Sequence, residues 1–170
     1  MLIITQKISA GLRSRIIIMA VYIYCIKENY GHSSLIKGRS FENEWFKLEA
    51  DGTVIVKGTN RKGYAWDGCS PKRKIKDIYF GTPEGVLNFD TGQSKTYYAS
   101  LIHDVFYQFS PDIKTFIKRK EVDNEFYLIL KENNFRGALV YYFAVRMLGW
   151  IYWGKCLTTI RQVKKAIGIY

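Results

Sequence analysis

The strongest constraint on the fold is an apolar pattern between Tyr98 and Phe109. Large apolar side chains recur there at three- and four-residue spacing, which is typical of one face of an α-helix. They are Tyr98, Leu101, Ile102, Val105, Phe106 and Phe109. The polar residues Ser100, His103, Asp104, Tyr107 and Gln108 have the same spacing on the other face. The pattern therefore predicts a helix with one face in a core and a stripe of polar groups opposite.

Two further helices are predicted after this one. The first runs from about Lys118 to Glu132, with an apolar face that includes Val122 and Phe126. The second, from about Gly137 to Trp153, is apolar nearly all round apart from Arg146 and Gly149. At about 17 residues it is short of the roughly 20 needed to span a bilayer, so we expect a core helix.

The N-terminal part of the chain has the pattern of β-structure. Residues 30–65 contain two extended stretches around Asp51 and Gly52, a pair that favours a tight hairpin turn. Residues 67–95 are rich in turn formers and are predicted to be loop-like. The chain is therefore expected to be one α+β domain over 1–170. It has a β-rich part (about 1–65), a three-helix region (about 66–153) and a basic tail (154–170).

An apolar stretch from Ile16 to Ile26 follows Arg13 and Arg15, in the manner of a signal peptide. However, no small-residue cleavage site follows Ile26, and the stretch is too short to span a bilayer. A buried strand and a membrane-surface anchor both fit it, and we favour the buried element.

The net charge and the cysteines of the chain indicate which partners it binds and in which cellular compartment it works. The chain has 26 Lys and Arg against 15 Asp and Glu, a formal charge of +11, which predicts attraction to nucleic acid or to an anionic membrane surface. Its three cysteines, Cys25, Cys69 and Cys156, lie far apart and form no zinc-type pair. Their odd number argues against a disulfide framework and favours a reducing compartment.

His103 and Asp104 stand side by side in the first predicted helix. Successive helical residues are rotated by about 100°, so the two must serve different tasks. Antiparallel packing of the second helix would bring Asp123 near His103 as a general-base dyad, and Asp67 within reach of Asp104 as a calcium-type oxygen site. The alternatives are a solvated or capping Asp123 and a simple turn at Asp67. The remaining histidine, His32, is interpreted as a loop residue.

Four segments, taken together and in order, favour a catalytic role for His103 and Asp123. They are WDGCS, ASLIHDVFY, VDNEFYLIL and VYYFAVRMLG, within Tyr64 to Gly149, about half of the chain. Their order resembles that of the bacterial and fungal secreted phospholipases A2. The chain is also similar to uncharacterised small phage and prophage proteins with Asp-Gly-Ala-Ser and His-Asp-x-x-Tyr motifs. DGCSPK and AVRMLG fit that second group better.

The resemblance implies a phospholipase A2-like helical core and a role for each matching residue. His103 would activate a water, Asp123 would orient His103, and Tyr107 would support the pair. Asp67 and Asp104 would give carboxylates to Ca²⁺, and Gly68 a backbone carbonyl. Two departures concern the scaffold. Ser100 stands where the phospholipases have a cysteine, so Cys69 lacks that partner, and the segment between Asp67 and His103 is longer.

Three functions follow as expectations. The first is a calcium-dependent phospholipid ester hydrolase of phage origin that works at anionic membranes. The alternative is a non-catalytic virion or accessory protein with the same scaffold, whose partners are other virion proteins. Nucleic-acid binding through PKRKIK ranks lower, because no known binding motif accompanies these charges. The expected location is the host cytoplasm or the virion, with membrane association.

Overall fold

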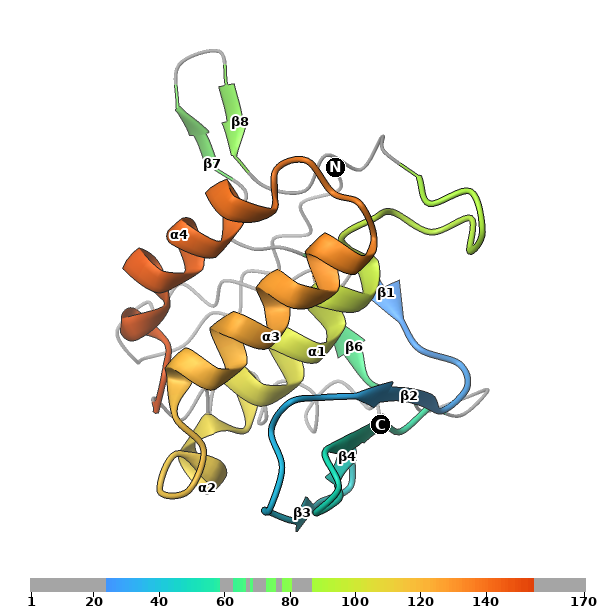
Figure 1. The fold of residues 1–170 in the computed structure, drawn as a ribbon, viewed down its shortest axis with the longest axis vertical. Helices are drawn as coiled ribbons and strands as arrows, with labels where there is room; N and C mark the ends of the chain where they lie inside the picture. The colour runs from blue at the N-terminus through green and yellow to red at the C-terminus, as the bar shows by residue number, and fades with distance from the viewer. Residues whose placement is uncertain are drawn as a thin grey trace, which may run out of the picture.

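The computed structural model describes residues 24–58, 63–66, 68, 73–75, 78–80 and 87–154. Antiparallel strands occupy the N-terminal half and helices the C-terminal half, which confirms the α+β class (Figure 1). Three predicted features lie wholly or partly outside the described residues. They are the apolar stretch from Ile16 up to residue 23, Asp67, and the basic tail from residue 155.

The main sheet has four antiparallel strands in the order β2-β5-β4-β3. Their bounds are β2 Tyr30–Ser33, β3 Phe41–Glu42, β4 Phe46–Leu48 and β5 Thr53–Val56. The predicted hairpin at Asp51 and Gly52 is confirmed, since β4 pairs with β5 there. Gly52 has a φ of 98°, and a Cβ at this position would collide with the carbonyl oxygen of Ser34. The turn therefore needs glycine for two independent reasons.

Two short strand pairs lie outside this sheet. One joins β1 (Tyr24–Cys25) to β6 (Ala65–Trp66), and the other joins β7 (Arg73–Ile75) to β8 (Ile78–Phe80). The second hairpin falls in residues 67–95, which the sequence predicts to be loop-like, so that prediction is wrong in part. Strands of three residues are too short for a period of two to be recognised in the sequence.

The helical half contains the three predicted helices and two shorter elements. The predicted helices are α1 (Tyr97–Gln108), α3 (Arg119–Glu132) and α4 (Ala138–Leu148). A four-residue helix, α2 (Ser110–Ile113), and a 3-10 turn at Gly149–Ile151 were not predicted. In Figure 1, α3 lies between α1 and α4, in agreement with its packing against both.

Local sequence explains where α3 begins and ends. The Glu121 carboxylate accepts a hydrogen bond of 2.8 Å from the backbone N–H of Lys118, which caps the first turn. Beyond the last turn, Asn134 adopts a left-handed conformation with a φ of 51°, which asparagine tolerates better than most residues.

The sheet and α1 share one core. Phe46 of β4 is fully buried, and its ring centroid lies 5.5 Å from that of Phe106 and 5.7 Å from that of Phe109. The predicted apolar face of α1 is confirmed, because five of its six members are buried. They are Leu101, Ile102, Val105, Phe106 and Phe109. Two members of the polar stripe, His103 and Tyr107, turn toward α3. Two others, Ser100 and Gln108, accept hydrogen bonds from Trp66 and Tyr64 instead.

The prediction that α4 is a core helix is wrong. Ala138 is its only buried residue, whereas Leu139, Val140, Phe143 and Met147 are each more than half exposed. A helix that is apolar all round carries no periodic signal to show which side is covered. Among the described residues, no helix has the length and apolarity needed to cross a membrane.

Candidate functional site

The polar stripe of α1 meets Asp123 of α3. The Nε2 atom of His103 lies 3.2 Å from Oδ1 of Asp123, and both side chains are buried. About ten residues connect the two helices, so that α3 packs directly against α1. The predicted contact between this imidazole and this carboxylate is therefore confirmed as geometry.

Tyr107 completes the contact from one turn further along α1. Its hydroxyl donates a hydrogen bond of 2.6 Å to the same Oδ1 of Asp123. Its ring stacks on the imidazole of His103, with centroids 4.1 Å apart and planes 29° apart. Phe126 of α3 packs on the imidazole at 4.8 Å. The imidazole is thus held by aromatic packing as well as by its hydrogen bond.

Two arginines, which sequence reasoning missed, hold the other oxygen of Asp123. Oδ2 lies 2.7 Å from Nη1 of Arg146 and 3.4 Å from Nη1 of Arg119. The same Nη1 of Arg119 donates hydrogen bonds to the backbone carbonyls of Val145 and Arg146, at 3.2 and 3.0 Å. A lone arginine in an otherwise apolar helix was the available signal, since such a residue needs a partner when it is partly buried.

The partners of Asp123 determine its charge. Burial alone would raise the pKa of this carboxyl, but hydrogen bonds from His103, Tyr107 and Arg146 outweigh burial and hold the pKa below its ordinary value. Burial and the bond to the Asp123 carboxylate raise the pKa of Tyr107. Asp123 is therefore an anion, and Tyr107 is a neutral donor to it.

The electrostatics of His103 favour its protonated form. Burial lowers the pKa of His103, but the carboxylates of Asp104 and Asp123 more than offset this and raise it above the ordinary value. Because Nε2 faces Asp123, the neutral ring carries its proton on Nε2 and its lone pair on Nδ1. Nδ1 lies 3.9 Å from Oδ1 of Asp104, an ion-pair distance that is too long for a direct hydrogen bond.

Gly149 closes the site where α4 ends. A Cβ at this position would collide with the hydroxyl of Tyr107 and lie 3.0 Å from Nη1 of Arg119. The φ of Gly149 is −62°, which any residue adopts, so the need for glycine here is one of space. Trp153 then packs edge-on against the ring of Tyr107, with centroids 5.2 Å apart.

The proposed calcium ligands are only partly described. Asp104 is on α1 with its side chain 25% exposed, and Gly68 is buried with a φ of 82°, whereas Asp67 lies outside the described residues. Within the described ranges, no group of three His, Cys, Asp or Glu residues is placed to hold a metal ion. Calcium takes 6–8 oxygen ligands. Asp104 and the backbone of Gly68 would supply only a minority of them.

His32 is not the loop residue that the sequence predicts. It lies in β2, and its Nε2 is 2.6 Å from Oε1 of Glu125, a residue of α3. The other oxygen of Glu125 accepts a 3.0 Å hydrogen bond from the backbone N–H of Leu35. The two partners are 93 residues apart in the sequence, so no local pattern around His32 indicates the contact.

No known protein family, no curated protein sequence and no solved structure shows a significant match to this chain. The functional argument therefore depends on the geometry of the cluster formed by His103, Tyr107, Arg119, Asp123 and Arg146.

Proposed function

We propose that this chain is a phospholipase A2-like, calcium-dependent ester hydrolase of phage origin that acts on phospholipid. The observation that carries the proposal is the 3.2 Å contact between Nε2 of His103 and Oδ1 of Asp123, with Tyr107 on the same oxygen. A buried carboxylate on one ring nitrogen fixes the tautomer of a histidine and stabilises its protonated form. This is what a general base needs.

In the proposed reaction, Nδ1 of His103 accepts the proton of a water molecule whose oxygen attacks the ester carbonyl carbon. The C–O ester bond then breaks, and the same proton passes from Nδ1 to the leaving alcohol oxygen. The products are a fatty acid and a lysophospholipid. Asp123 stays ionised throughout, since its own bonds to Tyr107 and Arg146 hold it in place.

Calcium belongs to this proposal through the resemblance and the position of Asp104. Asp67 and Asp104 would hold the ion with their carboxylates, and Gly68 with its backbone carbonyl, which are the hard oxygen donors that calcium prefers. When bound, the ion would polarise the ester carbonyl. Asp104 is suited to this task because it lies on the Nδ1 side of His103, where the ester would be bound.

The test is release of fatty acid from phosphatidylglycerol vesicles, with Ca²⁺ or with a chelator. We expect release in Ca²⁺ only, and at least a hundredfold less with His103→Ala. Asp104→Asn should raise the Ca²⁺ concentration needed for half-maximal release. Unchanged release by His103→Ala would refute the mechanism.

A second candidate function is a non-catalytic virion or accessory protein. The observation that favours it is the completeness of the bonding around Asp123, whose two oxygens contact His103, Tyr107, Arg119 and Arg146. Buried polar networks of this kind also stabilise folds that have no catalytic role. Presence in purified particles, together with no calcium-dependent hydrolysis, would establish this function in place of the first.

A further inference from the structure

The outer side of α4 is an exposed apolar surface. At about 100° per residue, Leu139, Val140, Phe143 and Met147 of α4 fall within an arc of about 100°, and Trp150 follows in the 3-10 turn. We call these five residues the α4 face. Each is 54–71% exposed, and the opposite side of the helix packs against α3. Contiguous exposed apolar residues on one helix are typical of a surface that binds a partner.

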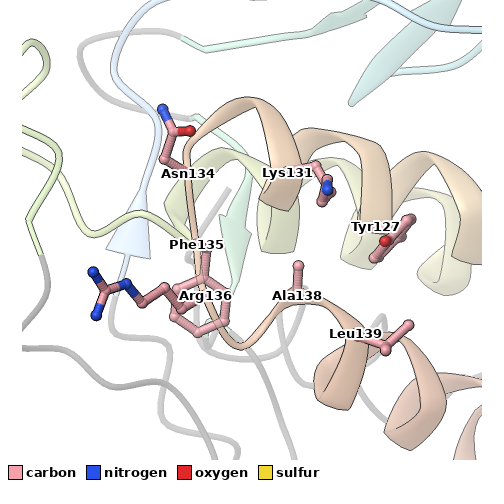
Figure 2. A pocket seen from close by; sticks show the side chains of 7 residues that line it. All are labelled: Tyr127, Lys131, Asn134, Phe135, Arg136, Ala138 and Leu139. Atoms are coloured by element: carbon pink, nitrogen blue, oxygen red, sulfur yellow. The ribbon is translucent and has the colours of Figure 1, made fainter.

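A groove with cationic side chains adjoins the α4 face. It has a volume of about 510 Å³ and lies between the end of α3 and the start of α4. In Figure 2, Tyr127 and Lys131 extend from α3, Ala138 and Leu139 lie on α4, and Phe135 and Arg136 occupy the turn between them. Leu139 belongs to both the groove and the α4 face. Lys131 and Arg136 are exposed, so cations border the apolar surface at this end.

The charge of this part of the sequence is entirely of one sign. Residues 133–170 contain no Asp or Glu and six Lys or Arg, at positions 136, 146, 155, 161, 164 and 165. A further cation, Lys114, lies near the other end of α4. Its side chain packs against Gly154, 3.2 Å from the position that a Cβ of this glycine would occupy. Trp150 and Tyr152 are also exposed there, and such residues favour the headgroup level of membranes. Within the described residues, the surface therefore combines the apolar α4 face, the aromatic Trp150 and Tyr152, and the cations Lys131 and Arg136.

We infer that the α4 face is the surface by which this protein docks on an anionic lipid bilayer, with the groove at Lys131 and Arg136 receiving headgroup phosphates. A helix whose exposed side is apolar and is bordered by aromatic and cationic side chains can lie in the plane of the interface with that side toward the acyl chains. The bilayer is favoured over a second copy of the chain because the two charged residues of the groove, Lys131 and Arg136, are both cations, so that anionic headgroups complement them and a second copy would repel them. The inference deepens the proposed function, since it rests on the same lipid class, but docking itself needs no hydrolysis.

Docking in this orientation would place the candidate site close to the lipid. Arg146 follows Val145 on the side of α4 that borders the α4 face, and it donates to Asp123 at 2.7 Å. One helix thus contacts the buried cluster at the border of the α4 face and would contact the membrane through that face.

The test is co-sedimentation of the full chain with phosphatidylcholine vesicles that do or do not contain phosphatidylglycerol, in chelator so that no calcium-dependent hydrolysis takes place. We expect binding to the anionic vesicles, and its loss on addition of salt. The variant Phe143→Ser with Met147→Ser should reduce the partition coefficient at least about tenfold. Leu139→Ser is an independent variant should the double substitution disturb folding, which thermal unfolding would reveal.

Matched controls come from exposed residues elsewhere. Phe89 and Leu35 are exposed apolar residues outside α4, with 101% and 71% exposure, so Phe89→Ser with Leu35→Ser removes similar groups and should leave binding unchanged. For charge, Lys131→Ser with Arg136→Ser should weaken binding to anionic vesicles about tenfold. Lys37→Ser with Lys120→Ser changes the net charge equally and should have a smaller effect.

Several outcomes would overturn the inference. The first is that the unaltered protein does not bind anionic vesicles. The second is that the α4-face variant binds as well as its control. The third is that the unaltered protein is a dimer which Phe143→Ser with Met147→Ser converts to a monomer. Binding to duplex DNA in place of vesicles would also overturn it. Vesicle binding by a protein that releases no fatty acid in Ca²⁺ would preserve the docking surface and reject the proposed hydrolysis, so the two failures are distinguishable.

Discussion

The molecule contains two histidine–carboxylate pairs, and both carboxylates belong to α3. His103 of α1 contacts Asp123 at 3.2 Å, and His32 of β2 contacts Glu125 at 2.6 Å. The two carboxylates are two residues apart and both are buried. By residue type the pairs are nearly identical, so the difference between them must come from their surroundings.

The surroundings differ in what else each carboxylate binds. Glu125 accepts a hydrogen bond from the backbone N–H of Leu35, so this pair connects β2 and the loop after it to α3. Asp123 instead accepts a hydrogen bond from the hydroxyl of Tyr107 and forms ion pairs with the guanidinium groups of Arg146 and Arg119. The ring of His103 also has a second carboxylate, that of Asp104, on its other side. The first pair is suited to joining sheet and helix. The second is suited to holding an imidazole in one orientation beside a further acidic group.

The largest expected effect separates the pairs by activity. His103→Gln should lower fatty acid release from phosphatidylglycerol vesicles by about 10²–10⁴-fold, because it removes the proposed base. His32→Gln is the matched control, and folded protein carrying it should lose less than about tenfold. Initial rates measured on both variants, after circular dichroism has established that each is folded, provide the comparison. Similar rate losses for the two would remove the functional distinction between the pairs.

The second-largest expected effect is a difference between the two pairs in their contribution to stability. Asp123→Asn leaves the positive charges of Arg119 and Arg146 without their counter-ion, and we expect it to lower the free energy of unfolding by about 3 kcal/mol. Glu125→Gln keeps an acceptor for the backbone N–H of Leu35 and should cost about 1 kcal/mol. Urea unfolding measures both values. A larger loss for Glu125→Gln would mean that the sheet contact, rather than the arginine cluster, holds α3 in place.

A smaller effect concerns Tyr107. Removal of its hydroxyl in Tyr107→Phe takes a hydrogen bond from a buried, ionised carboxylate, and should cost about 2 kcal/mol in urea unfolding. The control is Tyr64→Phe, which removes a 2.8 Å bond to the neutral side chain of Gln108 and should cost about 1 kcal/mol. Equal costs would show that the charge of Asp123 adds nothing to the bond.

The smallest effect is a dependence on pH. The folded protein raises the pKa of His103 above its unfolded value of about 6.5, so protonation favours the fold. The stability that His103 contributes, measured against His103→Gln, should be greatest below about pH 6.5 and should decline as pH rises through the folded pKa. Hydrolysis needs the deprotonated ring and should rise over the same range. A stability difference that does not vary with pH would contradict the raised pKa.

The sequence predicted the part of the site that depends on local pattern. Helical spacing placed His103 and Tyr107 on one stripe of α1, and the short connection to α3 implied the contact with Asp123. Arg146 was visible as an exception in an apolar helix, but its partner depends on how α4 packs, which no periodicity encodes. The contact of His32 with Glu125 joins distant segments in the same way. The exposed side of α4 was misjudged because apolarity alone does not show what covers a helix.

The close packing around Gly149, just after α4, should limit which substitutions the protein tolerates there. Even alanine there would push the helix away from α1, and the displacement would draw Arg146 off its carboxylate without altering any polar group. Damage at this position should therefore mimic the loss of a charged residue, although the substitution is chemically neutral. A survey of all substitutions from Ala138 to Gly149 should find the least permissive position at this glycine.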